Sequence, residues 1–410
     1  MELKGNVLRR FWTGVLLFFY IYTSLLFFFP GRIMSRMLIG LWGFLKSLFK
    51  RNIYANFLIG YAGVNLLFIF STILTYCITE NFNWWFIQHV ALNFVYLFGG
   101  VYIAERISAD SHTIDKFLNW IVIIILVHNI ITFIGHVYHP LGDFIFSIQK
   151  ESESDFVNSI FKWRSRALGF GVGRFFLGGT IGGLAIILCC YLMFRRYYSP
   201  LRGTILLALL LMTGIFIART TMMGLVGLGL LFVRNGKLQV ELLFKFIVST
   251  AIGALLIWMV YTLFFESTLS LSWAFELIIN YMDSGKLETA STNDLKTLFI
   301  YPDNESTWIF GDGKFVNADG SYYKHTDVGF LRIIYGLGLI GLFVFIVNQV
   351  YLMKCAIKYS PANQKMTPLV LVLAVYLIIL NIKGYVELNY FFYMLIGFLI
   401  YNRKKLIYGT

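Results

Sequence analysis

The sequence predicts an all-α protein that crosses a membrane many times. Of its 410 residues, 58% are hydrophobic and only 13% are charged, and its 41 phenylalanines outnumber its 34 lysines and arginines. Soluble domains carry roughly 25% charged residues, so this composition suits a lipid environment. Apolar runs near the length of about 20 residues that a spanning helix needs recur along the whole chain. We therefore expect one integral membrane domain over residues 1–410.

Twelve apolar runs are candidate membrane helices. We expect spans at residues 11–29, 33–49, 53–77, 84–104, 117–137, 168–194, 203–217, 220–233, 241–264, 328–353, 367–382 and 385–401. The first run is expected to stay as a helix, because no small-residue cleavage site of a signal peptide follows it. The second carries Arg36 and Lys46, so an amphipathic segment that lies flat on the membrane is the alternative there.

The distribution of basic residues favours one orientation of these spans. With both termini in the cytoplasm, more than half of the 34 lysines and arginines fall on the inner side and most of the 21 acidic residues fall outside. This agrees with the positive-inside rule. Residues 203–233 are expected to form two helices, because one helix would bury Arg219 at the bilayer centre at a cost of roughly 2.5 kcal/mol or more.

The basic residues and the cysteines also limit which partners and bonds we expect. The formal charge of +13 comes from basic residues scattered singly between apolar runs, whereas nucleic-acid binding needs a basic stripe, so we expect no nucleic-acid partner. The four cysteines show no CxxC or Cys/His ligand spacing, so we expect no metal and no disulfide. We also expect no cofactor.

Two predicted outer loops are long, at residues 139–167 and 266–327. The second is the most polar part of the chain and contains the turn-rich stretches Tyr301-Pro302-Asp303-Asn304-Glu305 and Gly311-Asp312-Gly313. Loops of this length without structure are uncommon unless they are functional. We therefore expect the chemistry on the outer side, with these loops as an active-site cover.

Basic residues on the predicted outer side are candidates for function, because the positive-inside rule disfavours them there. These residues are Arg164, Arg166, Arg174, Arg219, Arg332 and Lys383. The guanidinium groups of the arginines and the ammonium group of the lysine could hold an anionic ligand such as a lipid pyrophosphate. The alternative is that they bind lipid headgroups or pair with Glu151, Glu153 and Asp155. Function is favoured for Arg219, which has no acidic residue nearby in the sequence.

Histidine supplies a second set of candidates. His325 stands where the long loop enters a helix, so it could act as a general base with Asp327 orienting it; the alternative is an exposed loop in which Thr326 or Asp327 caps the helix. His89, His128 and His136 lie in apolar runs and are interpreted as interhelical hydrogen-bonding residues. The glycine run 169–173 follows no strand, so it is no nucleotide-binding loop, and glycines 178, 179, 182 and 183 predict close helix packing.

Several short motifs together resemble the O-antigen and capsular polysaccharide polymerases, which are related to the O-antigen ligases. They are Arg166-Ala167-Leu168-Gly169, Ala218-Arg219-Thr220-Thr221, Gly311-Asp312-Gly313, His325-Thr326-Asp327-Val328-Gly329, Gly338-Leu339-Ile340-Gly341, and Lys383 with Glu387. The likeness runs from about residue 166 to the C-terminus. Gly173-Arg174 departs from the Pro-Asn that the family often shows there. Asp327-Val328-Gly329 after the histidine favours a polymerase over a ligase.

The resemblance implies a GT-C-like bundle in the bacterial cytoplasmic membrane and a metal-independent, inverting glycosyl transfer. Arg166, Arg174, Arg219 and Arg332 would bind pyrophosphate, His325 and Asp327 would be catalytic, and Lys383 and Glu387 would bind substrate. The partners would be polyprenyl-pyrophosphate-linked oligosaccharides and membrane lipids, and a chain-length regulator is left open. An O-antigen ligase and a lipid-linked sugar flippase remain the alternatives.

Overall fold

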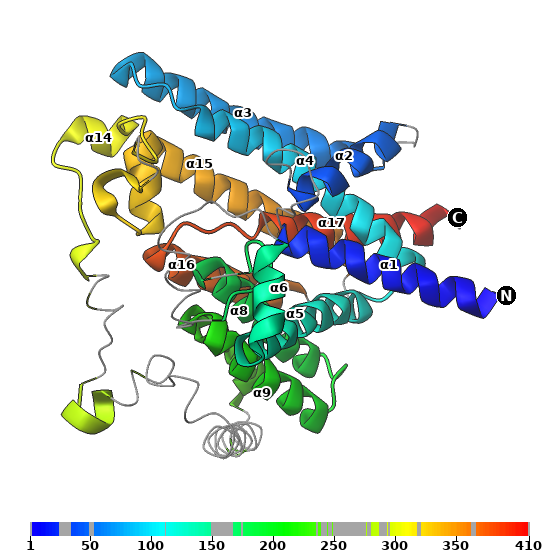
Figure 1. The fold of residues 1–410 in the computed structure, drawn as a ribbon. Helices are drawn as coiled ribbons and strands as arrows, with labels where there is room; N and C mark the ends of the chain where they lie inside the picture. Colours follow the sequence, from blue (N-terminus) through cyan, green and yellow to red (C-terminus); the bar gives the residue numbers. More distant parts are fainter. Residues whose placement is uncertain are drawn as a thin grey trace. The chain divides into compact units, whose positions relative to one another are not determined.

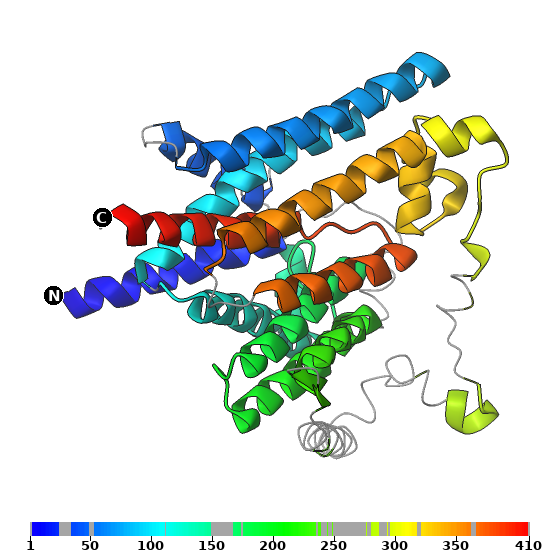
Figure 2. The same cartoon turned by 180° about the vertical axis from the view of Figure 1, so that it is seen from behind.

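A computed structural model describes most of the chain and is almost entirely helical there (Figure 1 and Figure 2). The described residues are 2–23, 34–48, 53–110, 112–148, 167–173, 175–234, 237–238, 280–286, 296–317, 321–361 and 366–408, with single positions 244, 248, 276 and 293. Within these ranges the strands are the two-residue β1 (Val233–Arg234) and β2 (Lys237–Leu238), which pair antiparallel.

The chain divides into two compact units. Unit 1 comprises Met1–Leu38, Arg106–Ile279 and Thr367–Tyr376, and unit 2 comprises Ile39–Glu105, Asn280–Met366 and Leu377–Thr410. Unit 1 contains α1 (Glu2–Tyr22), α5 (Ile114–Val137), α6 (His139–Ser147), α8 (Phe175–Phe194), α9 (Pro200–Ile217), the 3₁₀ helix η1 (Arg219–Leu228) and α10 (Gly229–Phe232). Unit 2 holds most or all of α2 (Ser35–Leu48), α3 (Ala55–Thr79), α4 (Trp84–Asp110), α14 (Glu305–Phe310), η2 (Tyr323–His325), α15 (Gly329–Tyr359) and α17 (Asn389–Tyr408), and α16 (Met366–Lys383) contributes to both.

Helix α8 is the centre of unit 1, because its glycines let other backbones come close. A Cβ atom on Gly179 would lie 2.8 Å from both Ala218 and Thr220, and one on Gly224 would lie 2.3 Å from the carbonyl oxygen of Gly183. The Tyr376 hydroxyl donates to the carbonyl oxygen of Thr180 at 2.9 Å. The prediction that the glycines of this segment serve close helix packing is confirmed.

Seven helices among the described residues are long and apolar enough to span a membrane: α3, α4, α5, α8, α9, α15 and α16. The chain is therefore an all-α polytopic membrane protein. Helix α2 has 14 residues and covers about 21 Å, less than the roughly 30 Å of a bilayer core. The predicted span 241–264 lies outside the described residues, apart from positions 244 and 248. The total of twelve spans stays a prediction.

Three segments differ in detail from the sequence prediction. The predicted outer loop 139–167 begins with the helix α6, where Pro140 occupies the first turn, a position at which proline costs no hydrogen bond. The predicted loop 266–327 includes the short helices α14 and η2, and Asn304 caps α14 by accepting from the backbone N–H of Thr307 at 2.7 Å. The predicted helix 220–233 is mostly the 3₁₀ helix η1, which is long for its kind.

Candidate functional site

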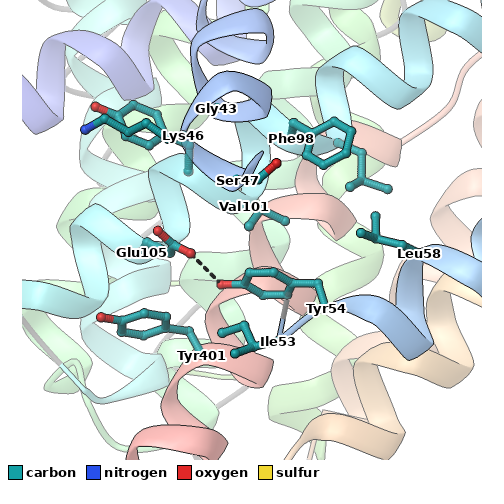
Figure 3. A pocket seen from close by; sticks show the side chains of 12 residues that line it. Gly43, Lys46, Ser47, Ile53, Tyr54, Leu58, Phe98, Val101, Glu105 and Tyr401 are labelled. Carbon is teal, nitrogen blue, oxygen red and sulfur yellow. Dashed lines mark hydrogen bonds between the residues drawn. The ribbon is translucent and has the colours of Figure 1, made fainter. Parts of the chain in front are cut away.

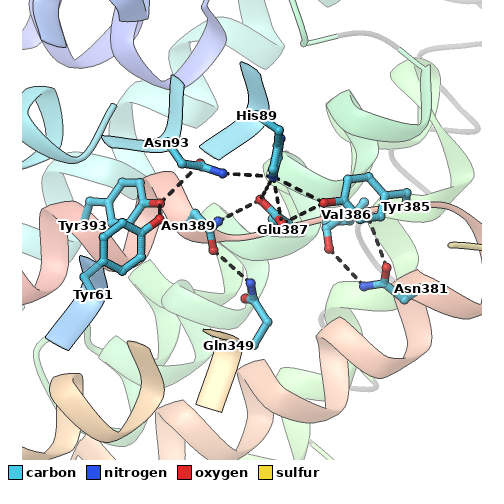
Figure 4. A network of polar contacts seen from close by, with 10 residues as sticks. All are labelled: Tyr61, His89, Asn93, Gln349, Asn381, Tyr385, Val386, Glu387, Asn389 and Tyr393. Atoms are coloured by element: carbon cyan, nitrogen blue, oxygen red, sulfur yellow. Dashed lines mark hydrogen bonds and ion pairs between the residues drawn. The ribbon is translucent and has the colours of Figure 1, made fainter. Parts of the chain in front are cut away.

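In unit 2 the start of α15 lies against the turn between α16 and α17. A Cβ atom on Gly329 would lie 2.6 Å from the carbonyl oxygen of Gly384 and 2.7 Å from the Asn381 side chain. Asn381 fixes this turn, since its amide donates to the carbonyl oxygen of Val386 at 3.0 Å and accepts from the N–H of Val386 at 3.2 Å (Figure 4). The contact brings Asp327, just before α15, close to Lys383, just before Gly384.

Three charged residues gather at this contact: Asp327, Arg332 and Lys383. The pKa of Asp327 is raised above its ordinary value because desolvation favours the neutral acid, although the positive charges of Arg332 and Lys383 oppose the shift. All three are site residues that the sequence predicts. The structure therefore brings together this carboxyl and two cations from segments about fifty positions apart in the chain.

Arg332 is held between aromatic rings. Its guanidinium carbon lies 3.6 Å from the ring centroid of Tyr322 and 4.1 Å from that of Phe315. Such cation–π contacts fix the plane of the guanidinium group. Its Nε atom is buried, and within the described part of the chain no acceptor hydrogen-bonds to it. A buried donor without a partner costs about 1–3 kcal/mol, and a bound anion would remove that cost.

Beside these cations lies a polar network centred on Glu387 (Figure 4). One carboxylate oxygen accepts from the Tyr385 hydroxyl at 2.7 Å and lies 3.1 Å from Nε2 of His89, and the other accepts from the Asn389 amide at 2.7 Å. Asn93, one helical turn after His89, contacts the His89 ring at 2.9 Å. Tyr61 and Tyr393 extend the network, with their hydroxyls in contact and that of Tyr393 bonded to Asn93.

The electrostatics of this network favour an ionised Glu387. Burial alone would raise the pKa of Glu387, but the charge of His89 and hydrogen bonds from His89 and Tyr385 outweigh it, and the pKa lies below its ordinary value. Burial and the neighbouring Glu387 charge raise the pKa of Tyr385 well above its ordinary value, so its hydroxyl stays a donor. Among the described residues, the Glu387 carboxylate contacts the side chains of His89, Tyr385 and Asn389, so it fixes the turn that carries Lys383. The predicted contact of Glu387 with substrate stays a prediction.

The Gly311-Asp312-Gly313 motif packs against an interruption in α15. Gly338 within that helix has φ +67° and ψ −168°, so the helical hydrogen bonding breaks there. The N–H of Asp312 donates to the carbonyl oxygen of Tyr335 at 2.7 Å, which supplies a carbonyl near the break with a partner. The motif therefore positions the first turns of α15, and with them Arg332.

His325 lies exposed in η2, directly before α15. Both Lys324 and His325 have left-handed backbone angles, with φ 55° and 54°. Such angles are uncommon for residues other than glycine and cluster at functional sites. The next residue, Thr326, is fully buried and donates to the carbonyl oxygen of Leu298 at 2.6 Å. This anchor holds the strained turn in place.

Of the remaining predicted arginines, the structure describes Arg219, which belongs to unit 1. Arg219 is the first residue of η1 and forms an ion pair with Glu276, 57 positions later in the chain. Sequence proximity did not reveal this partner, because the two residues are far apart in the chain. Arg166 and Arg174 lie outside the described residues.

The glycine run between these two arginines closes around His128. A Cβ atom on Gly169 or Gly173 would lie 2.6 Å from the His128 ring, so neither position has room for a side chain. The ring accepts from the N–H of Phe170 at 3.1 Å and stacks on Tyr22 with centroids 3.6 Å apart. His128 and His89 both form hydrogen bonds, but their distant partners lie in loops and not in other helices, so the interhelical bonds predicted for them are not seen among these contacts.

The pairing of His89 with Glu387 is what sequence reasoning missed. A signal was present, since an ionisable residue inside an apolar run is costly in a membrane and needs a partner.

The described residues define a polytopic helical membrane protein with a cationic end and a buried polar network in one of its units. Searches of family models, of curated proteins and of solved structures find no match for this chain.

Proposed function

We propose that this protein is a polysaccharide polymerase of the bacterial cytoplasmic membrane, with both termini inside and a GT-C-like bundle of about twelve helices. It would transfer a glycan from polyprenyl pyrophosphate to the terminal sugar hydroxyl of a lipid-linked repeat unit. One observation carries the proposal: the Arg332 guanidinium is held between two rings, has a buried Nε without a partner among the described residues, and lies near Lys383. This arrangement suits a phosphate-bearing ligand.

The chemistry needs fixed cations more than covalent catalysis. In the transfer, the acceptor hydroxyl oxygen bonds to the anomeric carbon while the bond from that carbon to the pyrophosphate oxygen breaks. The leaving pyrophosphate gains negative charge, which preorganised cations stabilise. Arg332 and Lys383 would supply this stabilisation, with Arg166, Arg174 and Arg219 as the further arginines that the motifs suggest.

His325 would take the proton of the acceptor hydroxyl, and Asp327 would orient the histidine or the sugar. The exposed, strained turn that carries His325 keeps its ring accessible, while buried Thr326 holds the backbone. Inversion at the anomeric carbon follows from a single displacement. Glu387 would act through the turn that carries Lys383 as a positioning residue.

Extension of a synthetic lipid-linked repeat by the purified protein tests this proposal. Arg332→Met keeps an apolar chain between the rings but removes the charge, so we expect elongation to fall about 100-fold, and His325→Ala should abolish it. Arg202→Met is the matched control, because Arg202 also lies over a ring, that of Tyr198 at 4.9 Å, but in the other unit. Wild-type elongation by Arg332→Met or by His325→Ala would show that the role assigned to that residue is wrong.

A lipid-linked sugar transporter is the second candidate, and a specific feature favours it. Transporters place interrupted helices at their substrate sites, and α15 is interrupted at Gly338. Translocation of a labelled lipid-linked sugar across liposomes without any longer product would favour transport over polymerisation. An O-antigen ligase differs by its deletion phenotype, since loss of a polymerase leaves core plus one repeat and loss of a ligase leaves none.

A further inference from the structure

Unit 2 contains a cavity that the proposed transferase chemistry does not use. Its volume is about 270 Å³, and it is lined by side chains from α2, α4, α17 and the start of α3 (Figure 3). Most of the wall is apolar, formed by residues that include Ile53, Leu58, Leu97, Phe98 and Val101. A concave, mostly apolar space with a few polar groups is typical of a small-ligand site.

The polar groups of this cavity have opposite charges. Lys46 and Glu105 both line it, together with the hydroxyl-bearing residues Ser47, Tyr54 and Tyr401. The Tyr54 hydroxyl donates to the Glu105 carboxylate at 3.0 Å, which orients the acid (Figure 3). The Lys46 ammonium lies 5.1 Å from the ring centroid of Tyr102. The cavity thus offers one positive and one negative group within one small volume.

The cavity lies where helices of unit 2 begin or end. Tyr54 directly precedes α3, Lys46 is in the last turn of α2, and Glu105 is near the end of α4. Tyrosine and tryptophan concentrate at the level of lipid headgroups, and Trp42, Tyr54, Tyr102 and Tyr401 are gathered around this site. Helix ends with clustered tyrosine and tryptophan are typical of the membrane–water interface.

We infer that this cavity binds the headgroup of a zwitterionic phospholipid with a primary amine, of the phosphatidylethanolamine class. Its phosphate would lie at Lys46 and Ser47, and its ammonium at Glu105 among the tyrosine rings. An anionic lipid would be repelled by Glu105, and a soluble amine would leave the apolar wall empty. The site does not depend on the proposed transferase activity.

Native mass spectrometry of the purified full chain, titrated with defined lipids, tests the inference. Wild-type protein should retain phosphatidylethanolamine about tenfold more tightly than phosphatidylglycerol, because each well-placed charged hydrogen bond contributes about that factor. Lys46→Met should weaken binding of both lipids. Glu105→Gln should weaken phosphatidylethanolamine and strengthen phosphatidylglycerol, a reversal that a purely structural role of Glu105 does not produce. Lys354→Met and Glu80→Gln, at exposed positions of the same unit, should change neither.

Two results with intact lipids would overturn the inference. One is equal retention of phosphatidylethanolamine and phosphatidylglycerol by wild-type protein, and the other is an unchanged preference in Glu105→Gln. Soluble phosphoethanolamine is a third arm, because competition by it at the same concentration as the lipid would show that the apolar wall does not contribute and that the lipid assignment is wrong. Phosphatidylcholine, whose quaternary amine cannot donate a hydrogen bond to Glu105, should bind more weakly than phosphatidylethanolamine.

Discussion

Gly311 lies directly against Gly338, the residue at which α15 is interrupted. A Cβ atom on Gly311 would stand 2.7 Å from the backbone nitrogen of Gly338, and one on Gly338 would stand 2.1 Å from the carbonyl oxygen of Ile309. Both glycines have positive φ, 77° and 67°. Two motifs that are separate in the sequence therefore pack closely against each other, and the one at Gly338 lies in the helix that also carries Arg332.

Gly338→Ala is expected to destabilise the protein by about 3 kcal/mol or more. The added methyl group would clash with backbone atoms, and alanine is strained at the positive φ of this position. The thermal midpoint in detergent should fall by several degrees. Gly63→Ala is the matched control, since Gly63 is in the middle of α3 with nothing within 4 Å of its added Cβ. That variant should be neutral or slightly stabilised, and equal midpoints for both variants would contradict the packing described.

Glu387 should make stability depend on acid pH. Its pKa in the folded protein lies below the unfolded value of about 4.3, so its stabilisation is fully present above about pH 4.3. It is lost as the pH falls through the folded pKa. Glu387→Gln should lower the free energy of unfolding at pH 7 by about 3 kcal/mol, and the thermal midpoint with it. Below about pH 4.3 the thermal midpoint of this variant should decline less steeply than that of the wild type.

Midpoints measured from pH 3 to pH 7 would check this expectation. Glu305→Gln changes an exposed carboxylate and should keep the wild-type slope. A wild-type slope in Glu387→Gln would mean that other carboxylates cause the acid sensitivity.

The ion pair of Arg219 with Glu276 allows binding and structural roles to be separated. If Arg219 grips the donor pyrophosphate, Arg219→Ala should reduce elongation about 100-fold with expression intact. Glu276→Gln should leave elongation within about threefold of the wild type, because it removes only a competing carboxylate. Initial extension rates and thermal midpoints of both variants, and of the double variant, provide the measurement. Equal losses in the two single variants would assign the pair a structural role.

The predicted orientation is open to a direct test with reporter fusions. Green fluorescent protein joined after Tyr408 should fluoresce, because the C-terminus is expected in the cytoplasm. Alkaline phosphatase placed within residues 280–286, which the charge distribution assigns to the outer side, should be active. The opposite pair of signals would reverse the orientation and place the charged end of unit 2 inside the cell.

Apolar runs located the helices well, but they could not set every helix end. The run at 84–104 starts where α4 starts, at Trp84, yet α4 continues to Asp110. Its last turn is polar, and Asp110 forms an ion pair with Arg9 of α1. Hydropathy follows the lipid core, whereas a helix can continue past it wherever tertiary contacts compensate. The sequence also did not predict the 3₁₀ geometry of η1. This geometry accompanies close packing of η1 on α8, and no local preference of the residues in η1 indicates it.

The candidate site likewise has features that the sequence indicates and features that only the fold reveals. Arg332 and Lys383 stand out in the sequence as basic residues near the predicted outer ends of apolar runs, and Asp327 stands out beside His325; their roles stay predictions. The partners of Arg219 and Glu387 do not stand out, since the pair of His89 with Glu387 joins positions 298 apart. Local sequence patterns identify the residues that need a partner, whereas the partner of each residue can be determined only from the fold.

The contact between η1 and α8 has a consequence for how the chain is made. A 3₁₀ segment that faces lipid would leave poorly satisfied backbone groups in hydrocarbon, so it is tolerated only when protein covers it. The covering helix, α8, is translated first, and residues 175–194 leave the ribosome before residues 219–228. The glycine-lined surface of α8 can therefore already stand in the bilayer as a docking partner when η1 arrives, and the order of synthesis suits the order of assembly.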